Sequence, residues 1–198
     1  AARNDHAGAL PLLRTAVDIQ PKLTRNRNDL ASSLVGLGRF DDAEPMLHEI
    51  VTEYPEFPLV HFNLGLLYEE QGRLAEAREA YETELENHPN SIVARFNLGN
   101  LLLRMGDPEA AAEQMQVLID DAPDKPRPYL LLARIRLAEG TDPAEVERLA
   151  RGGLERAEAA DLKALGYYLL ADVYSRQGRP AELQQALEQA QRYRAQIE

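Results

Sequence analysis

Histidines and carboxylates are the side chains through which this sequence could support acid–base catalysis or bind a metal ion. The chain has no cysteine and four histidines, which are His6, His48, His61 and His88. No two of these histidines are four residues apart, the spacing that places two metal ligands on one face of a helix. Glu44 lies four residues before His48, and Glu84 lies four residues before His88. We interpret both as solvent-exposed pairs on helices.

Sequence motifs for phosphate binding or nucleophilic catalysis are absent. The sequence contains no G-x-S-x-G, no phosphate-binding loop and no paired-glycine nucleotide motif. Serine is rare, and no Ser–His–Asp arrangement can be assembled from it. We therefore expect no catalytic residue, no cofactor and no metal site, and we predict that the chain is not an enzyme.

The composition predicts an all-helical protein that neither binds nucleic acid nor inserts into a membrane. The 198 residues include 33 acidic and 22 basic side chains, a formal net charge of −11, whereas neutralising phosphates requires an excess of Lys and Arg. No apolar run approaches the roughly 20 residues of a membrane span, and the N-terminus lacks the apolar core of a signal peptide. Ala, Leu, Glu, Arg and Gln are abundant, and these residues favour helices.

A period of 34 residues runs through the chain. Three sets of residues repeat at this spacing: Gly38, Gly72, Gly106 and Gly140; Pro55, Pro89 and Pro123; Ala43, Ala77 and Ala111. Agreement of three sets on one period is typical of a solenoid, in which each repeat buries its apolar face against its neighbours.

The segment 61–89 is the best-formed copy and reads as two helices joined by a turn. Its spaced residues are Leu64, Gly65, Tyr68, Ala77, Tyr81 and Pro89. This pattern resembles the tetratricopeptide repeat (TPR), with His61 in place of the tryptophan that usually opens it. The next copy has Leu98, Gly99, Leu102, Ala111, Met115 and Pro123. The resemblance implies an all-α fold, an α-solenoid of helix-turn-helix hairpins that forms a right-handed superhelix.

The repeated residues have physical roles that do not depend on the family. We expect Gly65 and Gly99 to lie where two helices cross too closely for a side chain. The glycines of the 34-residue series should end first helices in the left-handed conformation. The prolines should end second helices, because proline lacks the N–H donor and clashes with the preceding turn.

The period predicts a single array over residues 1–198. A half repeat at 6–20 precedes complete repeats at 24–57, 58–91, 92–125, 126–163 and 164–198, the last with a polar capping helix. The half repeat indicates either a fragment of a longer protein, which we favour, or a lone capping helix.

The fourth repeat departs from the period by four inserted residues. We expect Thr141 or Asp142 to cap the helix that Pro143 opens. Gly152 and Gly153 fall inside the second helix of this repeat. They indicate either close packing of helices or a weak point that acts as a hinge.

The resemblance to TPR proteins implies that the first helices line a concave face that holds extended peptides. The register then gives candidate peptide-binding residues: Asn28, Phe62, Asn63, Leu66, Phe96, Asn97, Asn100, Arg104, Arg127 and Arg134. A side-chain amide can both donate to and accept from a bound backbone, and the arginines would suit an acidic ligand. Alternatively, Asn63 and Asn97 bond between neighbouring helices and the Phe rings belong to the repeat interfaces.

These patterns predict a non-enzymatic protein–protein interaction scaffold that binds a protein or peptide partner in its groove. One alternative is an accessory TPR domain of a larger bacterial enzyme of the sulfatase or glycosyltransferase type. Another is self-association, because the uncovered apolar face of the first helix could pair with a second copy and form a homo-oligomer. The sequence does not indicate a compartment.

Overall fold

The computed structural model describes residues 5–197 and contains helices but no strand in that range. Its eleven helices are α1 (His6–Ile19), α2 (Thr24–Gly36), α3 (Phe40–Glu53), α4 (Val60–Glu70), α5 (Leu74–Asn87), α6 (Ile92–Met105), α7 (Pro108–Asp121), α8 (Pro126–Glu139), α9 (Pro143–Arg156), α10 (Ala160–Arg176) and α11 (Pro180–Arg194). The predicted all-α solenoid is confirmed. No helix within residues 5–197 is both long and apolar enough to cross a membrane.

Glycine and proline set the helix ends as predicted. The turns that follow α2, α4, α6, α8 and α10 each contain a glycine with φ between 66° and 83°, a conformation that side chains disfavour. Helices α3, α5 and α7 end two residues before Pro55, Pro89 and Pro123 respectively. The period therefore marks where the backbone must turn.

Aspartate caps α7 and α9, two of the helices that open with proline. The Asp107 carboxylate accepts a 3.1 Å hydrogen bond from the Ala110 N–H, and Asp142 accepts one of 3.0 Å from the Ala144 N–H. Of the two caps considered for α9, Asp142 is the one used. Helix α10 has 17 residues and begins at Ala160, four residues before the predicted start of the fifth repeat at 164.

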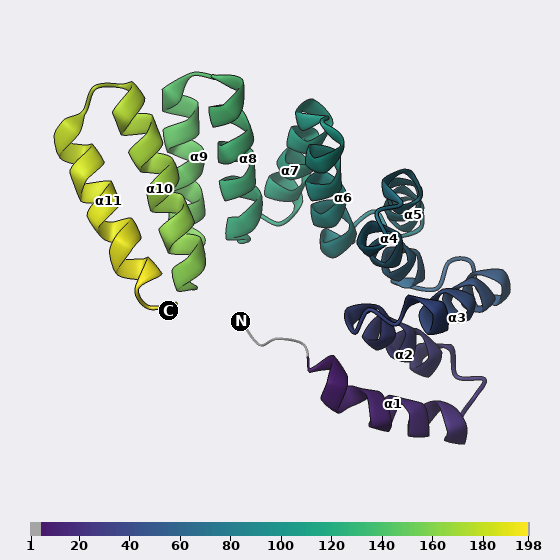
Figure 1. The fold of residues 1–198 in the computed structure, drawn as a ribbon. Coiled ribbons are helices and arrows are strands. Elements are labelled where there is room, and N and C mark those ends of the chain that lie inside the picture. Colours follow the sequence, from purple (N-terminus) through teal and green to yellow (C-terminus); the bar gives the residue numbers. More distant parts are fainter. Residues whose placement is uncertain (1–4, 198) are drawn as a thin grey trace. The chain divides into compact units, whose positions relative to one another are not determined.

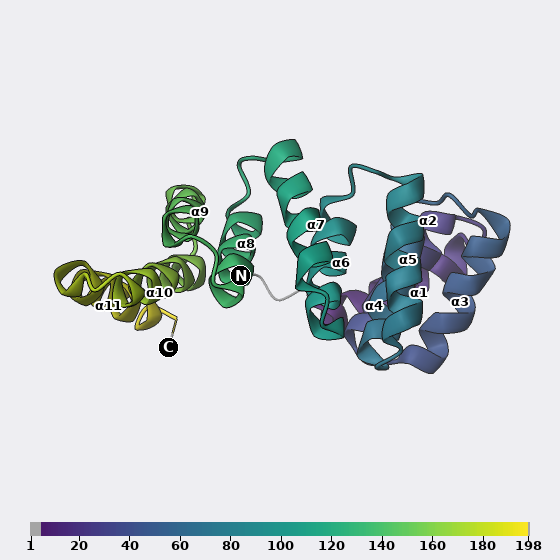
Figure 2. The ribbon, with the colours of Figure 1, turned by 90° about the horizontal axis from the view of Figure 1, so that it is seen from above.

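Contacts along the chain define two compact units, one ending at Gly106 and the other beginning at Asp107. In the first unit, α2 contacts α3 and α4, and α4 contacts α5 and α6; in the second, α8 contacts α7, α9 and α10, and α10 contacts α11 (Figure 1). Figure 2 shows the order α8, α9, α10 and α11 from a second side. A single continuous array over both units stays a prediction.

Close helix packing explains the glycines inside helices. A Cβ added to Gly65 on α4 would overlap the ring of Tyr81 on α5, which is fully buried. A Cβ added to Gly153 on α9 would lie 2.5 Å from Cδ2 of Leu130 on α8. The structure thus favours close packing over a hinge at Gly153.

Candidate functional site

The predicted peptide-binding residues lie on the first helices of the hairpins, in both units. Eight belong to α2, α4 and α6 of the first unit: Asn28, Phe62, Asn63, Leu66, Phe96, Asn97, Asn100 and Arg104. Arg127 and Arg134 belong to α8 of the second unit.

Asn28 and Asn63 are buried and bond to each other. Asn63 on α4 donates a 3.0 Å hydrogen bond from Nδ2 to Oδ1 of Asn28 on α2. Asn63 is 3% exposed and Asn28 is 5% exposed. Their amides connect neighbouring helices, the arrangement that the sequence left open as the alternative for Asn63. Contact of these two residues with a ligand stays a prediction.

Asn97 and Asn100 are half-buried and bond to their own helix. Nδ2 of Asn97 donates to the carbonyl of Val93 at 2.8 Å, and Nδ2 of Asn100 donates to the carbonyl of Phe96 at 3.0 Å. Each side chain keeps a second N–H and an Oδ1 that bond to nothing else within residues 5–197. Their orientation is fixed while part of their hydrogen-bonding capacity remains.

Apolar side chains lie at the start of α4, along it and on α6, and these two helices are in contact; Leu59 and Phe62 recur one repeat later as Val93 and Phe96. We call this group the apolar strip: Leu59, Phe62, Leu66, Val93 and Phe96. Leu59 and Val93 are 40% and 45% exposed, and the other three are half-buried. The Phe62 ring centroid lies 5.9 Å from that of Tyr81, so part of this ring also packs within its own hairpin.

Arg104 at the end of α6 is paired within the first unit. Its guanidinium bonds to Oε1 of Glu69 on α4, whose Oε2 accepts a 2.9 Å hydrogen bond from the Tyr81 hydroxyl. Burial of Tyr81, and then the negative charge of Glu69, raise the pKa of this hydroxyl. The Arg104 charge is thus already balanced by a carboxylate.

Arg127 and Arg134 are exposed on α8. Neither guanidinium has an ion-pair or hydrogen-bond partner among residues 5–197. These two positive charges are available to an external anion.

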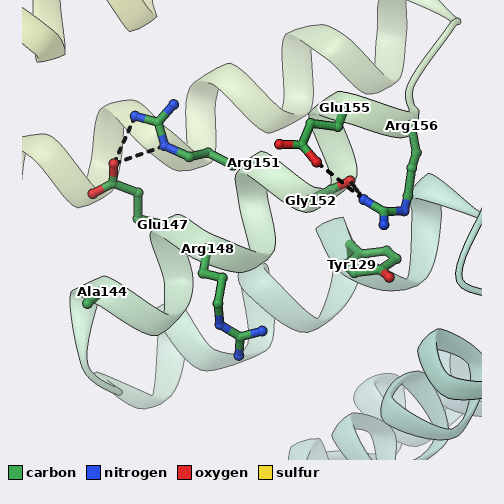
Figure 3. Close-up of a pocket in the computed structure, with 8 residues that line it drawn as sticks. All are labelled: Tyr129, Ala144, Glu147, Arg148, Arg151, Gly152, Glu155 and Arg156. Carbon is green, nitrogen blue, oxygen red and sulfur yellow. Dashed lines mark hydrogen bonds and ion pairs between the residues drawn. The ribbon is translucent and has the colours of Figure 1, made fainter.

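A hollow of about 510 Å³ lies on α8 and α9, and the sequence did not indicate it. Its lining residues, shown in Figure 3, are Tyr129, Ala144, Glu147, Arg148, Arg151, Gly152, Glu155 and Arg156. The Arg156 guanidinium lies 4.5 Å from the centroid of the Tyr129 ring and donates a 2.8 Å hydrogen bond to the Gly152 carbonyl. The hollow therefore has an aromatic wall and a charged rim.

Family models of the tetratricopeptide repeat match residues 28–92, 68–135 and 164–197. The chain belongs to the tetratricopeptide repeat family. The matches cover α4 and α6, which carry the apolar strip, whereas α9, which supplies most of the residues that line the hollow, lies between the second and third matches. No curated protein sequence matches this TPR chain.

Several solved structures share the fold of this TPR chain at low sequence identity. MamA is 16% identical, with a TM-score of 0.74, and the match covers 85% of this chain and 96% of MamA. YrrB, described as a TPR protein with an unusual peptide-binding site, is 14% identical with a TM-score of 0.71 and 91% of each chain covered. BtubC from P. vanneervenii is 19% identical with a TM-score of 0.71, covering 97% of this chain and 89% of BtubC. At these identities the likeness establishes the fold.

In the Glu44–His48 pair, His48 is exposed as expected, whereas Glu44 is half-buried and its carboxylate accepts a 2.8 Å hydrogen bond from Arg73. Glu44 Oε1 and His48 Nε2 are 3.9 Å apart, and the His48 side chain is 53% exposed. The Tyr68 hydroxyl lies 3.1 Å from the same nitrogen. No group of three or more His, Cys, Asp or Glu side chains within residues 5–197 is arranged to hold a metal ion.

The interpretation of Glu84 and His88 as an exposed pair is wrong. Glu84 is 1% exposed, and its carboxylate accepts hydrogen bonds from the N–H groups of Leu59 at 3.0 Å and Phe62 at 3.4 Å. These groups lie at the start of α4, where unpaired N–H donors and the helix dipole attract a carboxylate. Nε2 of His88 lies 3.1 Å from the carbonyl of Glu56 instead.

The TPR register reveals the signal for the hollow that sequence reasoning missed. Tyr129 lies three residues before Leu132 and Ala133, the position at which His61 precedes Leu64 and Gly65. Tyrosine at this position, together with the small residue Gly152 on the following helix, leaves an aromatic ring beside open space. The other lining residues lie on α9, a second helix, and the predicted peptide-binding positions are all on first helices.

Proposed function

We propose that this TPR chain is a non-enzymatic interaction module that binds an extended partner segment along α4 and α6. The observation that carries the proposal is the apolar strip, in which Leu59 and Phe62 recur one repeat later as Val93 and Phe96. Single exposed apolar residues are ordinary, whereas a contiguous group marks an interaction site. A partner with apolar side chains at alternating positions would cover the strip.

Asn97 and Asn100 give this surface its polar contacts. Because one N–H of each amide is bonded to the helix, the other N–H and the Oδ1 are held ready for a partner backbone. Each such bond contributes about 0.5–1.5 kcal/mol net. The peptide-binding site for which YrrB is described supports this use of the fold. In the second unit, we propose that Arg127 and Arg134 bind acidic groups of a partner.

Photo-crosslinking tests the location of the partner segment. A benzophenone side chain is placed at Val93, within the strip, and in a matched protein at Tyr54, which is 50% exposed and lies outside the strip. Each protein is irradiated with a random peptide pool, and the adducts are sequenced by mass spectrometry. We expect related peptides at position 93 only. Equal, unrelated adducts at both positions would contradict the proposal.

Self-association through α1 is a second candidate function, supported by a specific observation. None of the α1 residues is buried, and Leu12 and Ile19 are 74% and 72% exposed. A second copy of the chain could cover these side chains. Light scattering over a range of protein concentrations tests this, and a monomer at every concentration would contradict it.

A further inference from the structure

The cations of the hollow on α8 and α9 differ in how far they are neutralised. Arg151 donates to Oε1 of Glu147 at 2.9 Å and 3.0 Å, and Arg156 lies 3.6 Å from Glu155. Arg148 is exposed and has no ion-pair partner among residues 5–197. Figure 3 shows it extending from α9 between Ala144 and Tyr129, with no dashed line to another side chain. The hollow therefore offers one unneutralised guanidinium.

Small residues keep the hollow open. Gly152 has no side chain, and a Cβ added there would lie 3.0 Å from Cδ1 of Tyr129. Ala144 contributes only a methyl group. The volume of about 510 Å³ falls within the roughly 300–1,000 Å³ of known ligand pockets. The space is large enough for part of a polypeptide.

A second hollow, of about 330 Å³, is also lined by Arg151. Its aromatic wall includes Tyr167, which precedes Leu170 and Ala171 as Tyr129 precedes Leu132 and Ala133. Gln185 and Gln189, one turn apart on α11, also line it. The two hollows thus occur at equivalent repeat positions and share Arg151, so that one extended ligand can reach both.

The charges favour a peptide over a polyphosphate. The first hollow has three arginines and two glutamates, and only Arg148 lacks a carboxylate partner. One free guanidinium suits a single carboxylate, while a nucleic-acid backbone requires many unpaired cations. The amides of Gln185 and Gln189 can each donate to and accept from a peptide backbone.

We propose that α8 to α11 bind an extended acidic peptide segment of a partner protein. One glutamate or aspartate of the segment pairs with Arg148 in the hollow beside Tyr129. The backbone continues over Arg151 and bonds to Gln185 and Gln189 in the second hollow. This site is separate from the apolar strip on α4 and α6, and it does not depend on the function proposed for that strip.

A defined peptide tests the proposal. The probe alternates glutamate and alanine and carries an uncharged dye, and its control has glutamine in place of glutamate. Fluorescence anisotropy should show binding of the glutamate peptide only. Arg148→Glu should weaken this binding about tenfold or more, equivalent to about 1.4 kcal/mol. Arg192→Glu changes the net charge equally on an exposed residue of α11, and it should leave the affinity unchanged.

Amide chemical shifts locate the bound peptide. With ¹⁵N-labelled protein, the peptide should shift the signals of Ala144, Arg148 and Gly152 and leave those of α4 unchanged. Circular dichroism checks that Arg148→Glu retains the wild-type melting temperature. Equal affinities of the two charge variants would overturn the proposal. Shifts at Gly152 caused by a second copy of the chain, without any caused by the peptide, would also overturn it.

Discussion

Asn63 donates a 3.0 Å hydrogen bond to Asn28, and both side chains are buried between α4 and α2. Polar groups in such a place lose their contacts with water and need a protein partner. The pair therefore fixes the relative position of two first helices. Because α4 carries part of the apolar strip, the bond helps to position the proposed binding surface.

Asn63→Ala should destabilise the protein by about 1–3 kcal/mol, because it leaves Oδ1 of Asn28 buried without a donor. Asn97→Ala is the matched control at the equivalent position of the next repeat. Asn97 is half-buried and bonds to its own helix, so its loss should cost no more than about 0.5 kcal/mol. Urea unfolding measures both. Equal decreases in unfolding free energy for the two variants would show that the Asn28–Asn63 hydrogen bond does not stabilise the protein.

Glu147→Gln should lower stability more at neutral than at acidic pH. Burial raises the pKa of Glu147, but hydrogen bonds from Arg151, Arg179 and Tyr174 outweigh this and hold the pKa below its ordinary value. The stabilisation from the carboxylate is complete above the unfolded pKa of about 4.3. It is lost as the pH falls through the lower, folded pKa.

Unfolding free energies of wild type and Glu147→Gln at about pH 7 and about pH 3 test this. Hydrogen bonds to charged groups contribute about 1.5–3 kcal/mol. We therefore expect the unfolding free energy of wild type to exceed that of Glu147→Gln by about this amount at pH 7 and by less at pH 3. A difference in unfolding free energy that does not change with pH would mean that the charge of Glu147 does not stabilise its contacts with Arg151, Arg179 and Tyr174.

Leu59→Gly should be more stable than Leu59→Ala. Leu59 has φ of 67° before α4, and this left-handed conformation costs a residue with a Cβ about 1–2 kcal/mol. Glycine avoids that cost but loses about 0.5–1 kcal/mol through its freer unfolded chain. Both variants remove the same leucine contacts, so the difference between their thermal stabilities reports the backbone cost of the left-handed conformation at position 59. Alanine equal to or better than glycine would contradict the left-handed conformation.

Gly153→Ala should destabilise the protein. The added methyl would lie 2.5 Å from Cδ2 of Leu130, which is 1% exposed and cannot move freely. Overpacking costs about 1–3 kcal/mol, against the roughly 1 kcal/mol that alanine gains over glycine in a helix. Gly152→Ala is the control, since its methyl meets the half-buried Tyr129 ring at 3.0 Å. A Gly153 variant as stable as wild type would favour the hinge interpretation.

The helix ends could be predicted from sequence because they depend on local backbone requirements. Gly72 must adopt positive φ, and Pro89 cannot continue a helix, whatever the rest of the chain does. The small residue at Gly65 also follows from the period, since the neighbouring helix recurs at each repeat. These features need no knowledge of side-chain direction.

Side-chain direction could not be predicted from the period. The register places Asn63 and Asn97 at equivalent positions, yet one bonds to Asn28 and the other to its own helix. The bonding partner depends on the side chain that the preceding repeat places beside the asparagine. For Asn63 this side chain is the amide of Asn28, whereas the residue equivalent to Asn28 in the next repeat is Phe62. Glu84 is a similar case, because its burial depends on the unpaired N–H groups at the start of α4.

The affinity of a peptide recovered by crosslinking at position 93 tests the central claim most directly. Calorimetric titration would compare wild type with the double variant Phe62→Ala and Asn97→Ala. The control is the double variant Tyr54→Ala and Asn90→Ala, which removes an exposed ring and an exposed amide outside the strip. We predict that the Phe62 and Asn97 substitutions raise Kd by about tenfold or more, while the control keeps the wild-type Kd. Equal Kd values for all three folded proteins would contradict a partner site on α4 and α6.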